Sequence, residues 1–294
     1  MTLKLGMGAL YPEGVARSPK IALQAALACL AGLGITLVLA YFAPPFGGRD
    51  AATLQGFIDL NRPRLTPTID RIAHLADPVP YALIGLALVI VALARGRGRV
   101  GVAILAVLIC SAVTSESLKP LLSHPRPQEW LGDGQISAAS WPSGHATAAM
   151  ALALCAVLAV PARWRPAAAT GGGLFALAVA YAILVLGWHF PSDVIGGFLV
   201  AGLWTAVAVA AVARLDELRP PRAEPVRRSP IAARAPGVLV GAALLGAFLI
   251  ALDHPRAIAN YAQEHHAFML GAATIAALAA VLTAAASVVT TARR

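Results

Sequence analysis

Residues 168–188 read AATGGGLFALAVAYAILVLGW and carry no charged side chain. A helix of about 20 apolar residues is long enough to cross the hydrocarbon core of a bilayer. A helix that covers a soluble core shows one apolar stripe, with polar residues on the opposite face, whereas this run is apolar on every side. The stretch therefore predicts a transmembrane helix.

Similar apolar runs recur along the chain. They cover residues 21–43, 78–94, 100–118, 145–161, 168–188, 193–213, 236–252 and 267–290. Of the 294 residues, 59% are hydrophobic and 13% are charged, whereas soluble domains carry roughly half and a quarter, respectively. We therefore expect an all-α fold, a polytopic transmembrane helical bundle of about eight helices.

The basic residues report the orientation of this bundle. Sixteen of the 23 Lys and Arg residues lie at the two termini and in alternate connections, and seven lie in the remaining connections. Because cytoplasmic loops are enriched in Lys and Arg, both termini are predicted to be cytoplasmic. The net charge of +9 is not gathered into one patch and accompanies no nucleic-acid-binding motif, so no nucleic-acid partner is expected. The three cysteines lie inside apolar runs and are interpreted as buried hydrophobic residues.

The chain is predicted to have three parts. Residues 1–213 form a six-helix core, residues 214–235 form a cytoplasmic linker rich in Pro and Arg, and residues 236–294 form a C-terminal pair of transmembrane helices. The connection over residues 44–77 has mixed charge and could carry a short surface helix.

Three motifs fall in connections that the predicted topology places on the same, outer membrane face. They are Lys119-Pro-Leu-Leu-Ser-His-Pro-Arg126-Pro127, Trp141-Pro-Ser143-Gly144-His145, and Gly187-Trp-His189-Phe-Pro-Ser-Asp193. Lys119 and Arg126 are cations, and the guanidinium group suits forked contacts with phosphate oxygens. Ser143 and Gly144 open a helix, whose free backbone N–H groups and dipole favour an anion. The motifs therefore predict a phosphate-binding site.

Two histidines add catalytic chemistry to this site. Asp193 lies four residues after His189, where its carboxylate can hold one ring nitrogen and leave the other free to attack phosphorus. His145 has no such partner in its own motif and is suited to protonate a leaving oxygen. Glu116 lies one turn before Lys119, where it either pairs with the ammonium group or is exposed at the end of the helix.

The three motifs together resemble the type 2 phosphatidic acid phosphatase (PAP2) superfamily over about residues 78–213. The resemblance implies that His189 forms a phosphohistidine, that Asp193 supports it and that His145 is the general acid. It also implies that Lys119, Arg126, Ser143 and Gly144 hold the phosphate, and that neither a metal nor another cofactor is needed. The apolar runs point to the branch of membrane lipid phosphatases.

One position departs from the family pattern. The third motif normally begins with Ser-Arg, six residues before the nucleophilic His, but here these positions are Ala182 and Ile183. The missing Arg would contribute a phosphate contact, and loss of such a contact can reduce the rate on the order of a hundredfold. Four cations of the outer connections are candidate substitutes: Arg62, Arg64, Arg71 and His124.

The expected substrate and partner is an amphipathic lipid phosphate or pyrophosphate, bound from surrounding membrane lipids. Undecaprenyl pyrophosphate, phosphatidylglycerophosphate, phosphatidic acid and lipid A phosphate all fit, and the sequence indicates no oligomeric state. The alternatives are a lipid-phosphate phosphotransferase, a lipid-phosphate-binding protein or transporter that has lost turnover because of Ile183, and a structural scaffold. The Ala, Gly and Arg content is typical of a bacterium, so we expect an inner (plasma) membrane protein with its site on the periplasmic face.

Overall fold

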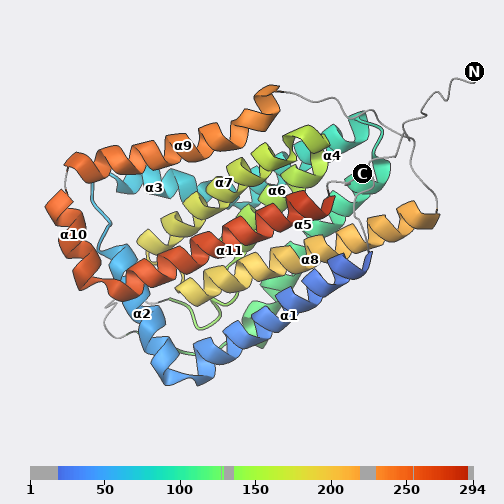
Figure 1. Ribbon diagram of the computed structural model, residues 1–294. Helices are drawn as coiled ribbons and strands as arrows, with labels where there is room; N and C mark the ends of the chain where they lie inside the picture. Colours follow the sequence, from blue (N-terminus) through green and yellow to red (C-terminus); the bar gives the residue numbers. More distant parts are fainter. Residues whose placement is uncertain (1–18, 127, 129–135, 219–229, 254, 291–294) are drawn as a thin grey trace, which may run out of the picture.

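The computed structural model describes residues 19–126, 128, 136–218, 230–253 and 255–290. Within these ranges the chain is helical, without strands, which confirms the predicted all-α fold (Figure 1). The helices are α1 (Pro19–Phe42), α2 (Pro44–Ile58), α3 (Thr66–Ala73), η1 (His74–Ala76), α4 (Pro78–Ala94), α5 (Gly98–Leu121), α6 (Gly144–Ala159), η3 (Ala162–Trp164), α7 (Arg165–Val185), α8 (Pro191–Leu218), α9 (Pro230–Asp253), α10 (Pro255–Glu264) and α11 (His266–Thr290).

Several of the helices are long and apolar enough to cross a membrane. Among the described residues these are α1, α5, α7 together with η3, α8 and α11, and the bent pair formed by α3 with η1 and α4 adds a sixth if it counts as one span. α6 is apolar but has only 16 residues. The chain is a multi-pass membrane protein, and the total of eight spans stays a prediction.

The outer surface of the bundle is apolar. Leu27 on α1, Leu83 on α4 and Val102 on α5 are 64%, 63% and 68% exposed, respectively. A contiguous apolar surface of this kind is costly in water. In a bilayer the acyl chains cover it, so these faces of the helices are assigned to lipid.

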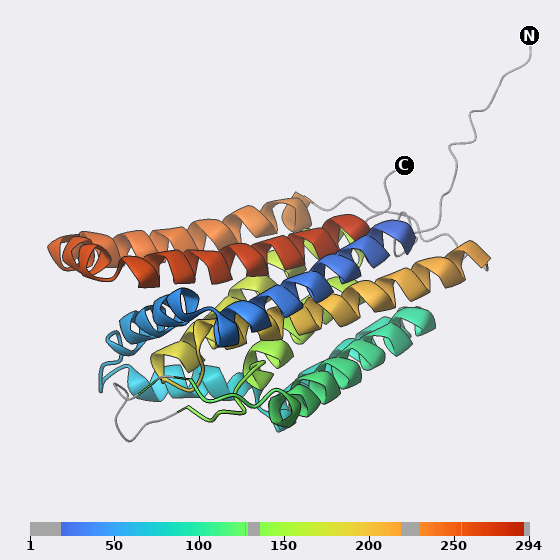
Figure 2. The same ribbon diagram turned by 90° about the horizontal axis from the view of Figure 1, so that it is seen from below.

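α6 lies in the middle of the bundle and is buried along most of its length. It packs against α4, α5, α7, α8 and α11 (Figures 1 and 2). Small residues allow these close contacts, because without a water-driven hydrophobic force membrane helices associate through tight packing. Gly172 of α7, for example, faces the backbone of Ala153 on α6. The central helix therefore has little freedom to shift.

α11 is part of the same core and is not an isolated appendage. Its Ile275 is fully buried in the cluster that contains Met150 and Leu184. Gly271 on α11 faces Thr53 of α2 so closely that a Cβ atom would lie 2.3 Å from the threonine methyl. α11 thus packs into the same core as the other described helices, and the division of the chain into three parts stays a prediction. Of the predicted linker over residues 214–235, the ends belong to α8 and α9, and residues 219–229 lie outside the described residues.

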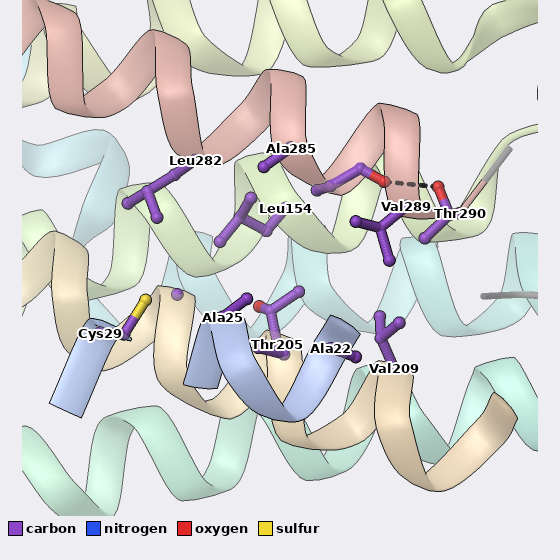
Figure 3. A pocket seen from close by; sticks show the side chains of 13 residues that line it. Ala22, Ala25, Cys29, Leu154, Thr205, Val209, Leu282, Ala285, Val289 and Thr290 are labelled. Carbon is purple, nitrogen blue, oxygen red and sulfur yellow. Dashed lines mark hydrogen bonds between the residues drawn. The ribbon is translucent and has the colours of Figure 1, made fainter. Parts of the chain in front are cut away.

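A small apolar cavity lies between α1, α8 and α11. It has a volume of about 60 Å³ and is lined by side chains such as Cys29, Thr205 and Leu282 (Figure 3). No charged side chain lines it, and none of the three motifs contributes to it. The cavity lies where α11 packs against the other helices of the core.

The helix bundle has two ends, each formed by a different set of helix termini. α1 begins and α11 ends at the same end of the bundle, at the right of Figure 1. α2, α3 and α10 gather at the opposite end. The connection over residues 44–77, predicted to carry a short surface helix, contains two α-helices, α2 and α3, and the 3₁₀ helix η1.

Gly197 holds the first turns of α6 and α8 together. A Cβ atom at this position would lie 2.7 Å from the carbonyl oxygen of Ser143 and 2.9 Å from the backbone nitrogen of Thr147. Both are backbone atoms of α6, which cannot move aside as a flexible side chain can. Only glycine permits this approach.

We predict that Gly197→Ala destabilises the protein by about 1–3 kcal/mol, because the added methyl group overpacks a rigid contact. Thermal unfolding of the purified protein in detergent measures this loss as a lower Tm. Gly34→Ala on α1 is the matched control, since a Cβ atom there meets nothing within 4 Å. Equal Tm values for the two variants would show that the two helices are not held by this contact.

Candidate active site

The three motifs meet at the end of the bundle where α5 ends and α6 and α8 begin. Lys119 lies in the last turn of α5, Ser143 is the N-cap of α6, and Asp193 lies in the first turn of α8. A hydrogen bond from the backbone N–H of Ser143 to the carbonyl oxygen of Asp193, 3.0 Å long, joins the second motif to the third. The folded chain therefore brings the sequence motifs together, as predicted.

The third motif is a tight turn that presents His189. α7 ends at Val185. Gly187, two residues on, has a φ of +71°, and the N–H of Trp188 returns to the carbonyl oxygen of Ile183 at 2.9 Å. Such a left-handed glycine is a common helix terminator. The chain then reverses direction and enters α8 at Pro191.

Asp193 orients His189. The side chain of Asp193 is fully buried, and its Oδ2 accepts a hydrogen bond from the backbone N–H of Phe190 at 3.0 Å. The same oxygen lies 3.3 Å from Nδ1 of His189. Because Nδ1 faces the carboxylate, Nε2 is the ring nitrogen left for other contacts. The pairing predicted from the four-residue spacing is present.

Arg126 is fixed by buried acceptors. Its Nη2 donates to Asp193 Oδ1 at 2.6 Å and to Ser140 Oγ at 2.7 Å. Its Nη1 donates to Ser192 Oγ at 3.0 Å and to Asp50 Oδ2 at 3.4 Å. The guanidinium carbon also lies 3.9 Å from the centre of the Phe190 ring, a cation–π contact. Arg126 thus ties the loop after α5 to the start of α8.

Asp50 on α2 completes this cluster, and the sequence analysis missed it. Its Oδ1 accepts from the backbone N–H of Ser192 at 2.9 Å, and its Oδ2 accepts from the Ser192 hydroxyl at 2.5 Å. Burial raises the pKa of Asp50 to about 6, against the lowering effects of the Ser192 hydrogen bond and the Arg126 charge. The partners are 142 residues apart, so no local pattern could have indicated the pair.

The side chain of Ser143 caps its own helix, α6. Its hydroxyl accepts a hydrogen bond from the N–H of Ala146 at 3.3 Å, and the residue is fully buried. This is the usual role of an N-cap serine. The remaining N–H groups of the first turn, beginning at Gly144, are the donors that the expected phosphate-binding role requires.

Lys119 lies directly beside Gly144. A Cβ atom at Gly144 would lie 3.2 Å from the Lys119 ammonium and 2.9 Å from Glu116 Oε1. Lys119 donates to Glu116 at 2.6 Å, so the pairing alternative for Glu116 is the one observed. A cavity of about 250 Å³ opens here and is lined by Lys119, Gly144 and His145 together with Tyr81 and Ser115.

His145 has a carboxylate partner, contrary to the expectation from its own motif. Its Nε2 lies 3.0 Å from Oδ1 of Asp77, the residue immediately before α4. The ring also contacts Trp188, with centroids 5.4 Å apart. Asp77 lies 68 residues from His145 in sequence, in a connection that gave no sign of a catalytic role.

Ile183 occupies an apolar site. It is fully excluded from solvent in the main hydrophobic cluster. Of the four proposed substitutes, Arg62 donates to the carbonyl oxygens of Asp59 and Asn61, and His124 contacts Tyr41, with ring centroids 5.0 Å apart. Arg64 and Arg71 are exposed. None of these observations shows a replacement for the missing guanidinium.

We predict that Asp50→Asn flattens the pH dependence of thermal stability. An unfolded Asp titrates near 4, while the folded pKa is about 6, so the folded state binds this proton more tightly. Ionisation of Asp50 therefore lowers stability as the pH rises from about 4 to about 6.

The Tm of wild type and variant, measured in detergent across that range, tests this expectation. Asp59→Asn, at the end of the same helix, is the control. If the wild type and Asp50→Asn gave parallel curves, the carboxylate would not titrate as stated.

Residues 100–217 match the family model of the PAP2 superfamily. The crystal structure of the first transmembrane PAP2 type phosphatidylglycerolphosphate phosphatase from Bacillus subtilis is similar with a TM-score of 0.47 and 18% identity, over 68% of this chain and 98% of that chain. No protein with a curated description matches the sequence. The family match spans all three motifs, so the part of the chain that carries the candidate site is similar to the PAP2 superfamily.

Proposed function

We propose that the protein hydrolyses a lipid-linked phosphate or pyrophosphate through a phosphohistidine at His189. The observation that carries the proposal is the buried Asp193 carboxylate, which holds Nδ1 of His189 and the guanidinium of Arg126 at once. The proposed nucleophile, His189, and the proposed phosphate-binding cation, Arg126, thereby share one carboxylate partner. This matches the nucleophile–base–orienter logic of covalent catalysis.

The proposed reaction has two steps. Nε2 of His189 attacks the terminal phosphorus and the bond from that phosphorus to the leaving oxygen breaks. The leaving oxygen belongs to the lipid alcohol or, in a pyrophosphate, to the lipid monophosphate, and His145 gives it a proton. A water molecule then attacks the phosphohistidine, His145 takes the water proton, and phosphate leaves as the P–N bond breaks. Lys119, Arg126 and the N–H groups at the start of α6 balance the charge of the phosphoryl oxygens.

The two cations contribute differently to this scheme. The two Nη atoms of Arg126 already have four acceptors, so a phosphate oxygen would have to replace one of them or use the one N–H group that these bonds leave, at Nε. Lys119 is 24% exposed, borders the cavity and has one carboxylate partner. We therefore assign the first contact with an arriving phosphate to Lys119.

The orientation follows from the charge bias of the sequence. Both termini are assigned to the cytoplasm, and the site is assigned to the periplasmic face of a bacterial inner membrane. The lipid chain would remain among the exposed apolar side chains of the bundle, while the headgroup reaches the end of α5.

One observation favours a second candidate, a protein that binds lipid phosphate without rapid turnover. Ile183 replaces the Arg of the family pattern and is buried among apolar side chains. A site that lacks this cation would still bind phosphate through Lys119 and the helix N-terminus, but it would stabilise the transition state less.

We predict that purified protein in detergent, with a metal chelator present, releases phosphate from at least one lipid of a panel. The panel contains undecaprenyl pyrophosphate, phosphatidylglycerophosphate, phosphatidic acid and lipid A phosphate. His189→Ala should abolish release, because the attacking nitrogen is lost. The control is His265→Ala, whose ring lies near Tyr261 and Asp59 and not in a motif.

Each outcome of this assay separates the candidates. Undiminished release by His189→Ala would refute the phosphohistidine. Binding of a lipid phosphate without release by the wild type would favour the second candidate. Release that requires an added lipid or sugar acceptor would identify a phosphotransferase.

A further inference from the structure

Asp77 and His145 form a second histidine–carboxylate pair in the candidate site. Nε2 of His145 lies 3.0 Å from Oδ1 of Asp77. The two side chains are 28% and 35% exposed, respectively. His145 lines the cavity beside Lys119, and so do Ala76 and Pro78, the two chain neighbours of Asp77. Asp77 belongs to none of the three motifs.

The carboxylate of Asp77 is not used for helix capping. Asp77 is the N-cap residue of α4, and aspartate at this position commonly accepts a hydrogen bond from its own helix. Here the side chain makes no capping hydrogen bond, and the next residue, Pro78, begins the helix. The chain bends by 54° between the helical segments on either side of Asp77. This bend carries the residue to the start of α6, where His145 lies.

The surroundings of the pair restrict the imidazole ring. Trp188 contacts His145 with ring centroids 5.4 Å apart and contacts His74 at 5.5 Å. Trp188 directly precedes His189 in the turn between α7 and α8. The same turn therefore carries His189 and contacts His145. His74 itself lies farther from the carboxylate, with its Nε2 4.0 Å from Asp77 Oδ2.

We propose that Asp77 is a positioning residue that orients His145 and supports its protonated form for transfer to the leaving oxygen. A carboxylate on one ring nitrogen fixes the tautomer and stabilises the imidazolium, leaving the other nitrogen to exchange a proton with the substrate. With Nε2 held by Asp77, that nitrogen is Nδ1 of His145. The inference rests on the proposed phosphatase function and adds a residue to it.

The leaving group distinguishes this role from a structural one. A lipid or alkyl phosphate has a poor leaving group, which needs a proton as the P–O bond breaks. A 4-nitrophenyl phosphate has a good leaving group, which departs as an anion and needs little help. Because kcat/KM reports the steps up to departure of the leaving group, it is the quantity to compare.

The experiment measures kcat/KM of the full-length protein in detergent with both kinds of ester. Asp77→Asn keeps the size of the side chain and should lower kcat/KM for the alkyl ester about 10- to 100-fold, while changing the value for the 4-nitrophenyl ester less than about threefold. His145→Ala should show the same selectivity with a larger loss. His74→Ala, which alters the other neighbour of Asp77, should retain both activities.

The outcomes are distinct. Equal losses of Asp77→Asn on both esters would assign Asp77 a purely structural role, and full activity on the alkyl ester would remove it from the mechanism; either result overturns the inference. A lower Tm of Asp77→Asn accompanied by the selective loss still supports it, since unfolding cannot discriminate between leaving groups. Inactivity of the wild type on both esters would instead refute the proposed function.

Discussion

The arrangement of the site depends on the buried ion pair between Arg126 and Asp193. Both side chains are almost completely removed from solvent, and their closest atoms are 2.6 Å apart. Breaking a buried pair by removing one partner leaves an uncompensated charge, which costs about 3–5 kcal/mol. The same carboxylate holds His189 and caps the backbone at Phe190. One interaction therefore fixes the loop after α5, the turn that carries His189 and the start of α8.

The cations of the site are balanced by carboxylates in the free protein. Lys119 pairs with Glu116, while Arg126 pairs with Asp193 and Asp50. An Arg at position 183 would add a further positive charge in a region that is now apolar. The replacement by Ile183 thus lowers the charge available to an anion and at the same time adds to the hydrophobic packing of α7. At this position the hydrophobic packing of α7 is satisfied and the family motif is not.

Much of the fold was predictable because its signals are local. Each of the eight apolar runs coincides with a helix, since hydropathy over about 20 residues is sufficient to indicate one. The contact between His189 and Asp193 was predictable for the same reason, because four residues separate them. The partners of the other site residues were not. Asp50 meets Ser192, and Asp77 meets His145, through contacts between elements distant in sequence, and an isolated Asp in a polar connection does not differ from any other surface carboxylate.

The link between Asp50 and Ser192 has a consequence for how this protein can change. The serine supplies two of the donors that keep the buried carboxylate satisfied, and Arg126 supplies another. Loss of the hydroxyl would leave the carboxylate short of a hydrogen bond in a buried site. Beside an apolar residue at position 50 the same loss would remove only the contact of the hydroxyl with Arg126 and would cost less. Positions 50 and 192 are thus epistatic, and although 142 residues apart, they should vary together as related sequences diverge.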